Sequence, residues 1–154
     1  MSKNISDARL EPTSDWSSSP KTVVITGVTG QVAEVVATEL SRDHQVVGLA
    51  RFTDEAARRR LEECGVECIP TDLLTAEFVG VPTDVDAVLN FAVVKSQRWD
   101  VDLRANAESA GLLMAHTQPK AFLHCSSTGV YAAAGSKVLD VGCGPGRHAH
   151  ALAR

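Results

Sequence analysis

Lys-Thr-Val-Val-Ile-Thr-Gly-Val-Thr-Gly-Gln-Val-Ala, residues 21–33, is the stretch that decides the fold. An apolar, β-branched run ends in a turn that holds Gly27 and Gly30, and a helix-compatible segment follows as far as Leu40. A strand that enters a glycine turn and opens a helix directs backbone N–H groups, and the positive end of the helix dipole, at whatever lies above the turn. The pattern predicts a phosphate-binding turn, and a purely structural tight turn is the alternative.

Short apolar runs and helix-compatible segments alternate from this turn onward. Strands are expected at 22–26, 45–50, 66–69, 85–94 and 121–125. Helices are expected at 31–42, 54–64 and 99–117, and a short helix or loop at 73–81. Strands without polar alternation suit a sheet that is covered on both faces, and the β-α order indicates right-handed crossovers. We therefore predict an α/β fold, a doubly wound parallel sheet of the Rossmann type, which binds ligands beyond the carboxyl ends of its strands.

Composition narrows the class of protein. The 154 residues are 44% hydrophobic and 22% charged with a net charge of −4, which favours one core and disfavours nucleic acid or a membrane surface as partner. Residues 1–20 are polar and are expected to form a disordered tail. The sequence has neither an apolar run of about 18 residues nor a signal-peptide h-region, so we expect a cytoplasmic protein.

The four cysteines, Cys64, Cys68, Cys125 and Cys143, lie in or beside apolar runs and form no C-x-x-C pair. We expect them to be reduced and buried, and we predict no metal site.

Five motifs together resemble one family. Residues 24–33 are similar to the Thr-Gly-Ala-Thr-Gly-x-x-Gly fingerprint of extended short-chain dehydrogenases/reductases, the NAD-dependent epimerase/dehydratase group. Asp72-Leu73 resembles the segment with the family's adenine-contacting Asp, and Asn90-Phe91-Ala92 resembles its His-Leu-Ala segment. Residues 125–131 resemble its Ser-Ser-x-x-Val-Tyr-Gly motif, and residues 106–110 the Asn-Val-x-Gly-Thr segment on the helix under the active site. The resemblance implies an NAD(P)-binding Rossmann domain over residues 21–133.

The resemblance also implies which residues contact the cofactor. They are Thr26, Gly27, Thr29, Gly30, Gln31, Val32, Asp72, Leu73, Phe91, Ala92 and Val93. Ala33 stands where the fingerprint needs a small residue for helix–strand packing. An acidic residue after the second strand would bind a ribose 2′-OH, but Ala50 and Arg51 stand there, and a guanidinium could pair with a 2′-phosphate. We therefore predict NADP in preference to NAD; the alternative is a solvated surface arginine.

The catalytic part of the family pattern is incomplete. Ser127 stands four residues before Tyr131, the spacing of the family's catalytic Ser or Thr, although a serine pair that caps a strand end is the alternative. The family's proton-transfer pair is Tyr-x-x-x-Lys, but Gly135 follows Tyr131, the only tyrosine, at that spacing, and Lys137 is six residues on. The resemblance implies a small-molecule substrate with a hydroxyl or carbonyl group, such as a nucleotide sugar, and is compatible with a homodimer. We predict cofactor binding with little or no turnover.

Residues 137–146 carry a second glycine-rich pattern, Lys-Val-Leu-Asp-Val-Gly-Cys-Gly-Pro-Gly. It resembles motif I of class I S-adenosylmethionine-dependent methyltransferases, with Asp140, Gly142, Gly144 and Gly146 as the matching residues. We expect a truncated Rossmann sheet followed by an extra βα unit over 134–154, because 126–136 is too short and has no helical pattern for a parallel crossover. A sixth edge strand is the alternative for this segment. Two alternatives for function stay open, a methyltransferase fragment that binds S-adenosylmethionine and a non-catalytic nucleotide-binding module.

Overall fold

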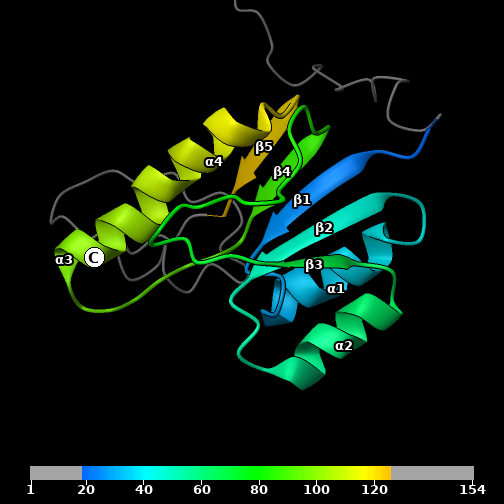
Figure 1. The fold of residues 1–154 in the computed structure, drawn as a ribbon, viewed down its shortest axis with the longest axis horizontal. Coiled ribbons are helices and arrows are strands. Elements are labelled where there is room, and N and C mark those ends of the chain that lie inside the picture. The colour runs from blue at the N-terminus through cyan, green and yellow to red at the C-terminus, as the bar shows by residue number, and fades with distance from the viewer. Residues whose placement is uncertain (1–18, 126–154) are drawn as a thin grey trace, which may run out of the picture. The chain divides into compact units, whose positions relative to one another are not determined.

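The fold is known from a computed structural model, which describes residues 19–125 (Figure 1). Five parallel strands form one sheet in the order β3-β2-β1-β4-β5. The strands are β1 (Thr22–Thr26), β2 (Gln45–Ala50), β3 (Glu67–Pro70), β4 (Ala87–Asn90) and β5 (Ala121–His124). The helices are α1 (Gln31–Leu40), α2 (Glu55–Glu63), α3 (Trp99–Leu103), the π-helical η2 (Arg104–Glu108) and α4 (Ser109–Thr117). This order confirms the Rossmann-type parallel sheet that the sequence predicts.

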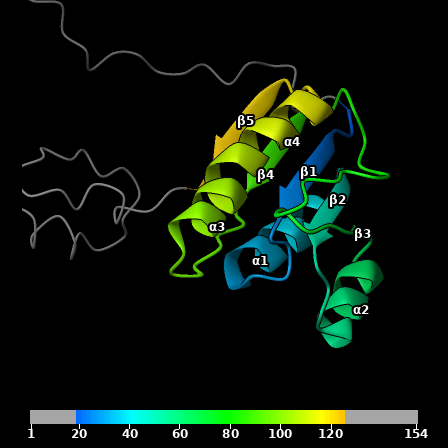
Figure 2. The ribbon, with the colours of Figure 1, turned by 60° about the vertical axis from the view of Figure 1, so that its left-hand side comes forward.

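Helices cover the described sheet on both faces. Figure 1 shows α1 and α2 on one side and α3 and α4 on the other, and Figure 2 shows the second pair lying along β4 and β5. Successive residues of a strand point to opposite faces, so each strand contributes to two cores. One core contains Ile25 and Val46 with Leu61 of α2, and the other contains Val24 and Val88 with Leu113 of α4. Burial on both faces explains why the strand sequences lack polar alternation.

Helix boundaries follow local chemistry. The Asp54 carboxylate accepts hydrogen bonds from the N–H groups of Ala56 and Ala57 at 2.9 and 3.3 Å, which starts α2 at the next residue. Gly65, with φ of +85°, ends that helix as the sequence predicts. Helix α1 ends two residues earlier than expected, where the Ser41 hydroxyl hydrogen-bonds the carbonyls of Thr38 and Cys64.

Strand β4 is the main departure from the predicted elements. The sequence predicts a strand over 85–94, but the ladder with β1 and β5 spans only Ala87–Asn90. Beyond Asn90 the backbone N–H groups donate to side chains instead of a neighbouring strand. The hydroxyl of Thr26 accepts the N–H of Ala92 at 3.1 Å, and the side-chain oxygen of Asn106 accepts the N–H of Val94 at 2.8 Å. Apolar composition therefore extends past the end of the strand into a loop.

Two further expectations are refined. Residues 73–81 form turns, so the loop alternative is the correct one, and 99–117 is helical with a π-helical stretch in its middle. The predicted burial of the cysteines is wrong for Cys64 and Cys125, which are exposed, whereas Cys68 is half-buried. All three are free thiols, and Cys143 lies outside the described residues.

Most of the predicted tail at 1–20, the boundary at 133–134 and the predicted extra βα unit lie outside the described residues. Between residues 19 and 125, no helix is long and apolar enough to cross a bilayer.

Candidate functional site

The glycine turn connects β1 to α1 at the centre of the sheet. Gly27 has φ of +64°, and its N–H donates to the carbonyl of Leu49 on β2 at 2.8 Å. A Cβ atom on Gly27 would lie 2.9 Å from Cα of Ala92, and one on Gly30 would lie 3.1 Å from the carbonyl oxygen of Gly27. Glycine is therefore required at Gly27 for its backbone conformation and for the close approach of the β4 loop.

The amino end of α1 opens directly above this turn. Gly30 is its N-cap and supplies no side-chain hydrogen bond. The first N–H groups of an α-helix have no intrahelical acceptor, and the helix dipole adds positive potential there, so this end suits an anion. Ala33, buried in the core, lets the helix pack closely on the sheet, as the fingerprint predicts. Glu34 in the same first turn is paired with Arg60 at 3.0 Å, which offsets the carboxylate charge near the opening.

A cavity of about 570 Å³ lies at the carboxyl ends of the strands. Nine residues predicted to bind cofactor line it: Gly27, Thr29, Gly30, Arg51, Asp72, Leu73, Phe91, Ala92 and Val93. The lining does not include three others, Thr26, Gln31 and Val32. Ser127 and the tail residues Asp140, Gly142, Gly144 and Gly146 lie outside the described residues. The structure thus brings together segments that follow β1, β2, β3 and β4, which the sequence separates widely.

Thr26 is buried beneath the cavity and connects strands. Its hydroxyl donates to Oδ1 of Asn90 and accepts the N–H of Ala92 at 3.1 Å. Nδ2 of Asn90 in turn lies 2.8 Å from Nδ1 of His124. This row of polar side chains crosses the ends of β1, β4 and β5 on the α4 side of the sheet, so it fixes where the glycine turn and the β4 loop meet.

Charged groups are distributed unevenly around the cavity. Arg51 follows β2 and Lys95 belongs to the loop after β4, whereas Asp72 follows β3. The carboxylate of Asp72 accepts the N–H of Leu74 at 2.9 Å, which shapes the start of that loop. Two cations, one carboxylate and the amino end of a helix make the site suitable for an elongated anionic ligand.

Sequence reasoning missed six lining residues, namely Leu49, Ala50, Thr71, Leu74, Val94 and Lys95. Leu49 and Ala50 are the last residues of β2, and Thr71 directly follows β3, so the position of strand ends could have identified them. Lys95 follows the apolar run 85–94, but the strand itself ends at Asn90, so the position of the strand end does not identify Lys95.

The strand order, the glycine turn and the cavity above it define a Rossmann-type dinucleotide-binding fold. The profile of the NAD dependent epimerase/dehydratase family matches residues 23–147, and the chain belongs to this family. The matched range also includes all of residues 137–146, which resemble methyltransferase motif I. No curated protein sequence matches the chain significantly.

Solved structures with the same fold include dehydrogenases and an epimerase. A putative short-chain dehydrogenase/reductase from Corynebacterium glutamicum is 27% identical with a TM-score of 0.54, over 64% of this chain and 57% of that one. A UDP-N-acetylglucosamine 4-epimerase from Methanobrevibacter ruminantium M1 is 20% identical with a TM-score of 0.64, over 80% and 43%. A putative 2-deoxy-d-gluconate 3-dehydrogenase from Agrobacterium tumefaciens with bound NADP is 16% identical with a TM-score of 0.55, over 67% and 48%.

The match covers only about half of each of these structures, between 43% and 57% of their chains. What this chain shares with the family is therefore the NAD(P)-binding domain. The family match supports NAD(P) as the cofactor, and the amino end of α1, whose N-cap Gly30 supplies no side-chain hydrogen bond, fits its diphosphate.

Proposed function

We propose that this chain binds NADP(H) in preference to NAD(H), in the cavity between the glycine turn and the loops after β2, β3 and β4. One observation supports this preference above all: Arg51 lines the cavity at the end of β2, and Ala50 before it offers no acceptor for a ribose 2′-OH. In the described part of the chain, Arg51 has no ion-pair partner. Its guanidinium is thus available to a 2′-phosphate.

Each part of the cavity has a separate role in this proposal. The N–H groups at the start of α1 bind the diphosphate, with Gly27 and Gly30 allowing its close approach. Asp72 and Leu73 contact the adenine, and Phe91, Ala92 and Val93 lie along the half of the ligand that extends toward β4. In a catalytically complete relative, the bound cofactor would supply or accept a hydride. The residues in the described cavity bind and orient it.

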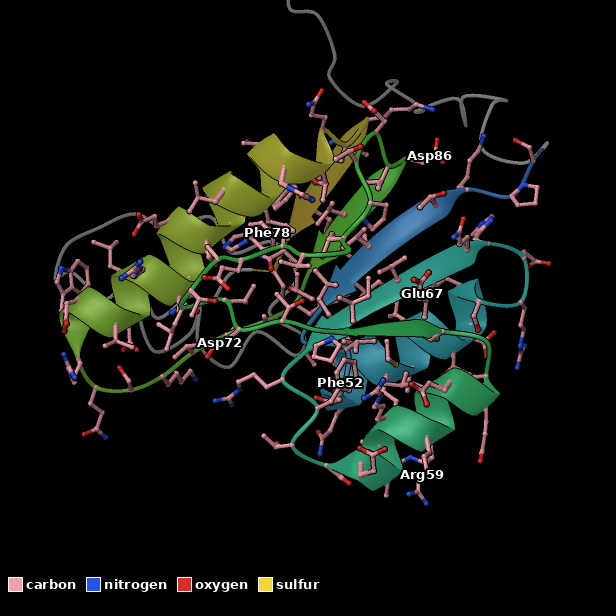
Figure 3. The ribbon with its side chains drawn as sticks, in the orientation of Figure 1. Phe52, Arg59, Glu67, Asp72, Phe78 and Asp86 are labelled. Carbon is pink, nitrogen blue, oxygen red and sulfur yellow. The ribbon has the colours of Figure 1, made fainter. Side chains whose placement is uncertain are left out.

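Isothermal titration calorimetry with NADPH and NADH tests the preference. We expect wild type to bind NADPH more tightly and Arg51→Ala to lose about tenfold in NADPH affinity, the value of one charge-assisted contact to a partly solvated group. NADH affinity should change little. Arg59→Ala is the matched control, because Arg59 is a solvent-exposed arginine of α2 outside the cavity lining (Figure 3). Equal affinity of wild type for the two cofactors would contradict the proposal.

For chemistry we propose cofactor binding with little or no turnover. In a catalytically complete relative, the substrate would be a nucleotide sugar or another compound with a hydroxyl or carbonyl group. Ser127 would orient the reacting oxygen of that substrate. Tyr131 is the only tyrosine, and the fourth residue after it is Gly135, so the sequence lacks Tyr-x-x-x-Lys. Without a lysine to lower its pKa, a tyrosine is a poor proton donor and acceptor at neutral pH. Rapid NADPH oxidation by the purified chain with a ketone or nucleotide-sugar substrate would overturn this part.

We further propose a division of the chain into two parts and a cellular location. Residues 21–133 form the cofactor-binding unit and 134–154 a methyltransferase-like tail, in a cytoplasmic protein that can form a homodimer.

S-adenosylmethionine binding is the second candidate, and the pattern at 137–146 favours it. Titration with S-adenosylmethionine tests it: binding that Asp140→Ala abolishes would support a methyltransferase fragment, and no binding would exclude it.

A further inference from the structure

A row of three polar side chains runs from beneath the cavity to the exposed end of β5. In the sheet register Thr26 is paired with Asn90 and Asn90 with His124, at the carboxyl ends of β1, β4 and β5. Thr26 and Asn90 are buried, with exposed fractions of 0% and 4%, whereas His124 is exposed. The row therefore connects a solvent-exposed imidazole to two polar groups that water barely reaches.

The donors and acceptors of this row fix the protonation state of His124. The Thr26 hydroxyl accepts the N–H of Ala92 at 3.1 Å and donates its own hydrogen to Oδ1 of Asn90. The Asn90 amide then presents Nδ2, which can only donate, and its partner at 2.8 Å is Nδ1 of His124. Nδ1 must accept this bond, so the imidazole is neutral and carries its proton on Nε2.

The reversed orientation of the Asn90 amide does not satisfy the row. It would turn Nδ2 toward Thr26, whose oxygen would then accept from both Ala92 and Asn90. The hydroxyl hydrogen of a fully buried threonine would lose its acceptor, and a buried donor left unsatisfied is costly. An imidazolium at His124 requires this reversed orientation, because Nδ1–H needs an acceptor. Protonation at the surface would thus be transmitted to Thr26.

The Thr26 hydroxyl also sets where the loop after β4 meets the glycine turn. It accepts the N–H of Ala92, and Ala92 lines the cavity together with Gly27. The two segments approach so closely that a Cβ atom on Gly27 would lie 2.9 Å from Cα of Ala92. A bond lost at Thr26 therefore acts at the meeting point of two segments that line the cavity.

Within residues 19–125, the charged groups of the neighbouring elements have partners other than His124. Strand β4, which pairs with β5, has no charged residue, and the adjacent titratable group on the chain is the thiol of Cys125. The helical segment on this side of the sheet carries charged or titratable groups that are engaged elsewhere: Asp100 with Arg98, Asp102 with Ser96, Arg104 with Glu108, and His116 with the carbonyl of Val81.

We propose that His124 is a positioning residue of the cofactor cavity that acts only as the neutral imidazole. Its protonation turns the Asn90 amide, disrupts the bonds of Thr26 and loosens the loop after β4, so acid lowers the affinity for the dinucleotide. This inference rests on the proposed NADP binding and adds a dependence on protons to it. Because linkage is reciprocal, a bound dinucleotide disfavours protonation of His124 by the same factor.

Calorimetric titration with NADP⁺ at pH 7.5 and pH 5.5 tests the inference, because imidazoles change charge in this range. The 2′-phosphate also takes up a proton at about pH 6, so wild type and variants are compared at each pH. His124→Asn keeps an acceptor oxygen in place of Nδ1 but does not titrate. We expect wild type to lose roughly 5- to 10-fold more affinity on acidification than His124→Asn, the effect of one buried hydrogen bond partly lost. At pH 7.5 the two proteins should bind alike.

Two further variants complete the comparison. His124→Ala removes the acceptor, so it should weaken NADP⁺ binding roughly threefold or more at pH 7.5 and share the shallow pH dependence of His124→Asn. If the alanine variant does not fold, the asparagine variant alone decides the test. His44→Gln is the matched control, because His44 lies before β2 at the other end of the strands, where its Nδ1 accepts the N–H of Lys21 at 3.4 Å. It should keep the wild-type pH profile.

The outcomes distinguish this inference from the proposed function. If wild type binds NADP⁺ and His124→Asn shows the same pH profile, the role of His124 is refuted while NADP binding stands. Nitrogen-15 NMR of the imidazole should show the Nε2–H tautomer at pH 7.5, and an Nδ1–H tautomer would also refute the inference. If wild type binds no dinucleotide, the proposed function itself fails and this inference fails with it.

Discussion

Replacement of Gly27 by alanine tests the central geometry of the site. An alanine at φ of +64° adopts a left-handed conformation that costs about 1–2 kcal/mol. Its Cβ would also lie 2.9 Å from Cα and 3.0 Å from N of Ala92, so the backbone of the β4 loop must move. Forced displacement in a packed region costs about a further 1–3 kcal/mol. We therefore expect Gly27→Ala to lower the free energy of unfolding by about 2–5 kcal/mol.

Gly65→Ala is the matched control, because it isolates the conformational cost. Gly65 has φ of +85°, and a Cβ there would meet nothing within 4 Å. Its loss should be only about 1–2 kcal/mol, with NADPH affinity unchanged. Urea unfolding gives both free energies, and calorimetric titration gives the affinities. If Gly27→Ala is no more destabilising than Gly65→Ala and binds NADPH as well as wild type does, the close approach of Ala92 does not shape the site.

Two further predictions concern groups away from the cavity. Asp86, which Figure 3 shows at the opposite end of the parallel strands from Asp72, has its pKa lowered by Lys120 and then by the N–H of Thr22. The ionised carboxylate of Asp86 therefore stabilises the fold above its unfolded-state pKa of about 3.9, and this stabilisation is lost as the pH falls through the lower folded-state pKa. Asp86→Ala should lower the free energy of unfolding by about 1–2 kcal/mol at pH 7, and urea unfolding at acid pH should show a smaller difference from wild type. Burial raises the pKa of Cys68 to about 11, so iodoacetamide should modify it far more slowly at pH 8 than the exposed Cys64, and equal rates by mass spectrometry would contradict its burial.

The order of elements could be predicted from sequence because local and global signals agree. Buried parallel strands are apolar throughout, and helix boundaries are marked by residues such as Asp54 and Gly65. The glycine turn adds a constraint that few folds share, since it joins a buried strand directly to a helix. Most of the cavity lining was predicted by the resemblance to the family's motifs, which follow strand ends, where ligands of this fold bind.

The end of β4 could not be predicted in this way. Residues 91–94 are as apolar as the strand before them, but their backbone hydrogen bonds go to the side chains of Thr26 and Asn106 instead of a neighbouring strand. These contacts join positions 12 and 66 residues apart, and no local pattern encodes them. Sequence reasoning therefore extended the strand and passed over Lys95.

The residues that would bind the cofactor and those that would transfer a proton lie in different parts of the family pattern. The cofactor half of the family pattern lies on β1, β2, β3 and β4, where the structure gathers Gly27, Arg51 and Asp72 around one cavity. The proton-transfer half, Tyr-x-x-x-Lys, comes after β5 in the family pattern. Tyr131, the only tyrosine, falls in the segment that resembles Val-Tyr-Gly, and Gly135 instead of lysine is the fourth residue after it. A site can retain cofactor affinity without turnover, because the groups that hold the dinucleotide are distinct from the group that moves a proton. Titration and turnover measurements on the same preparation are therefore independent tests, and a chain that binds NADPH tightly without oxidising it is the result that this separation predicts.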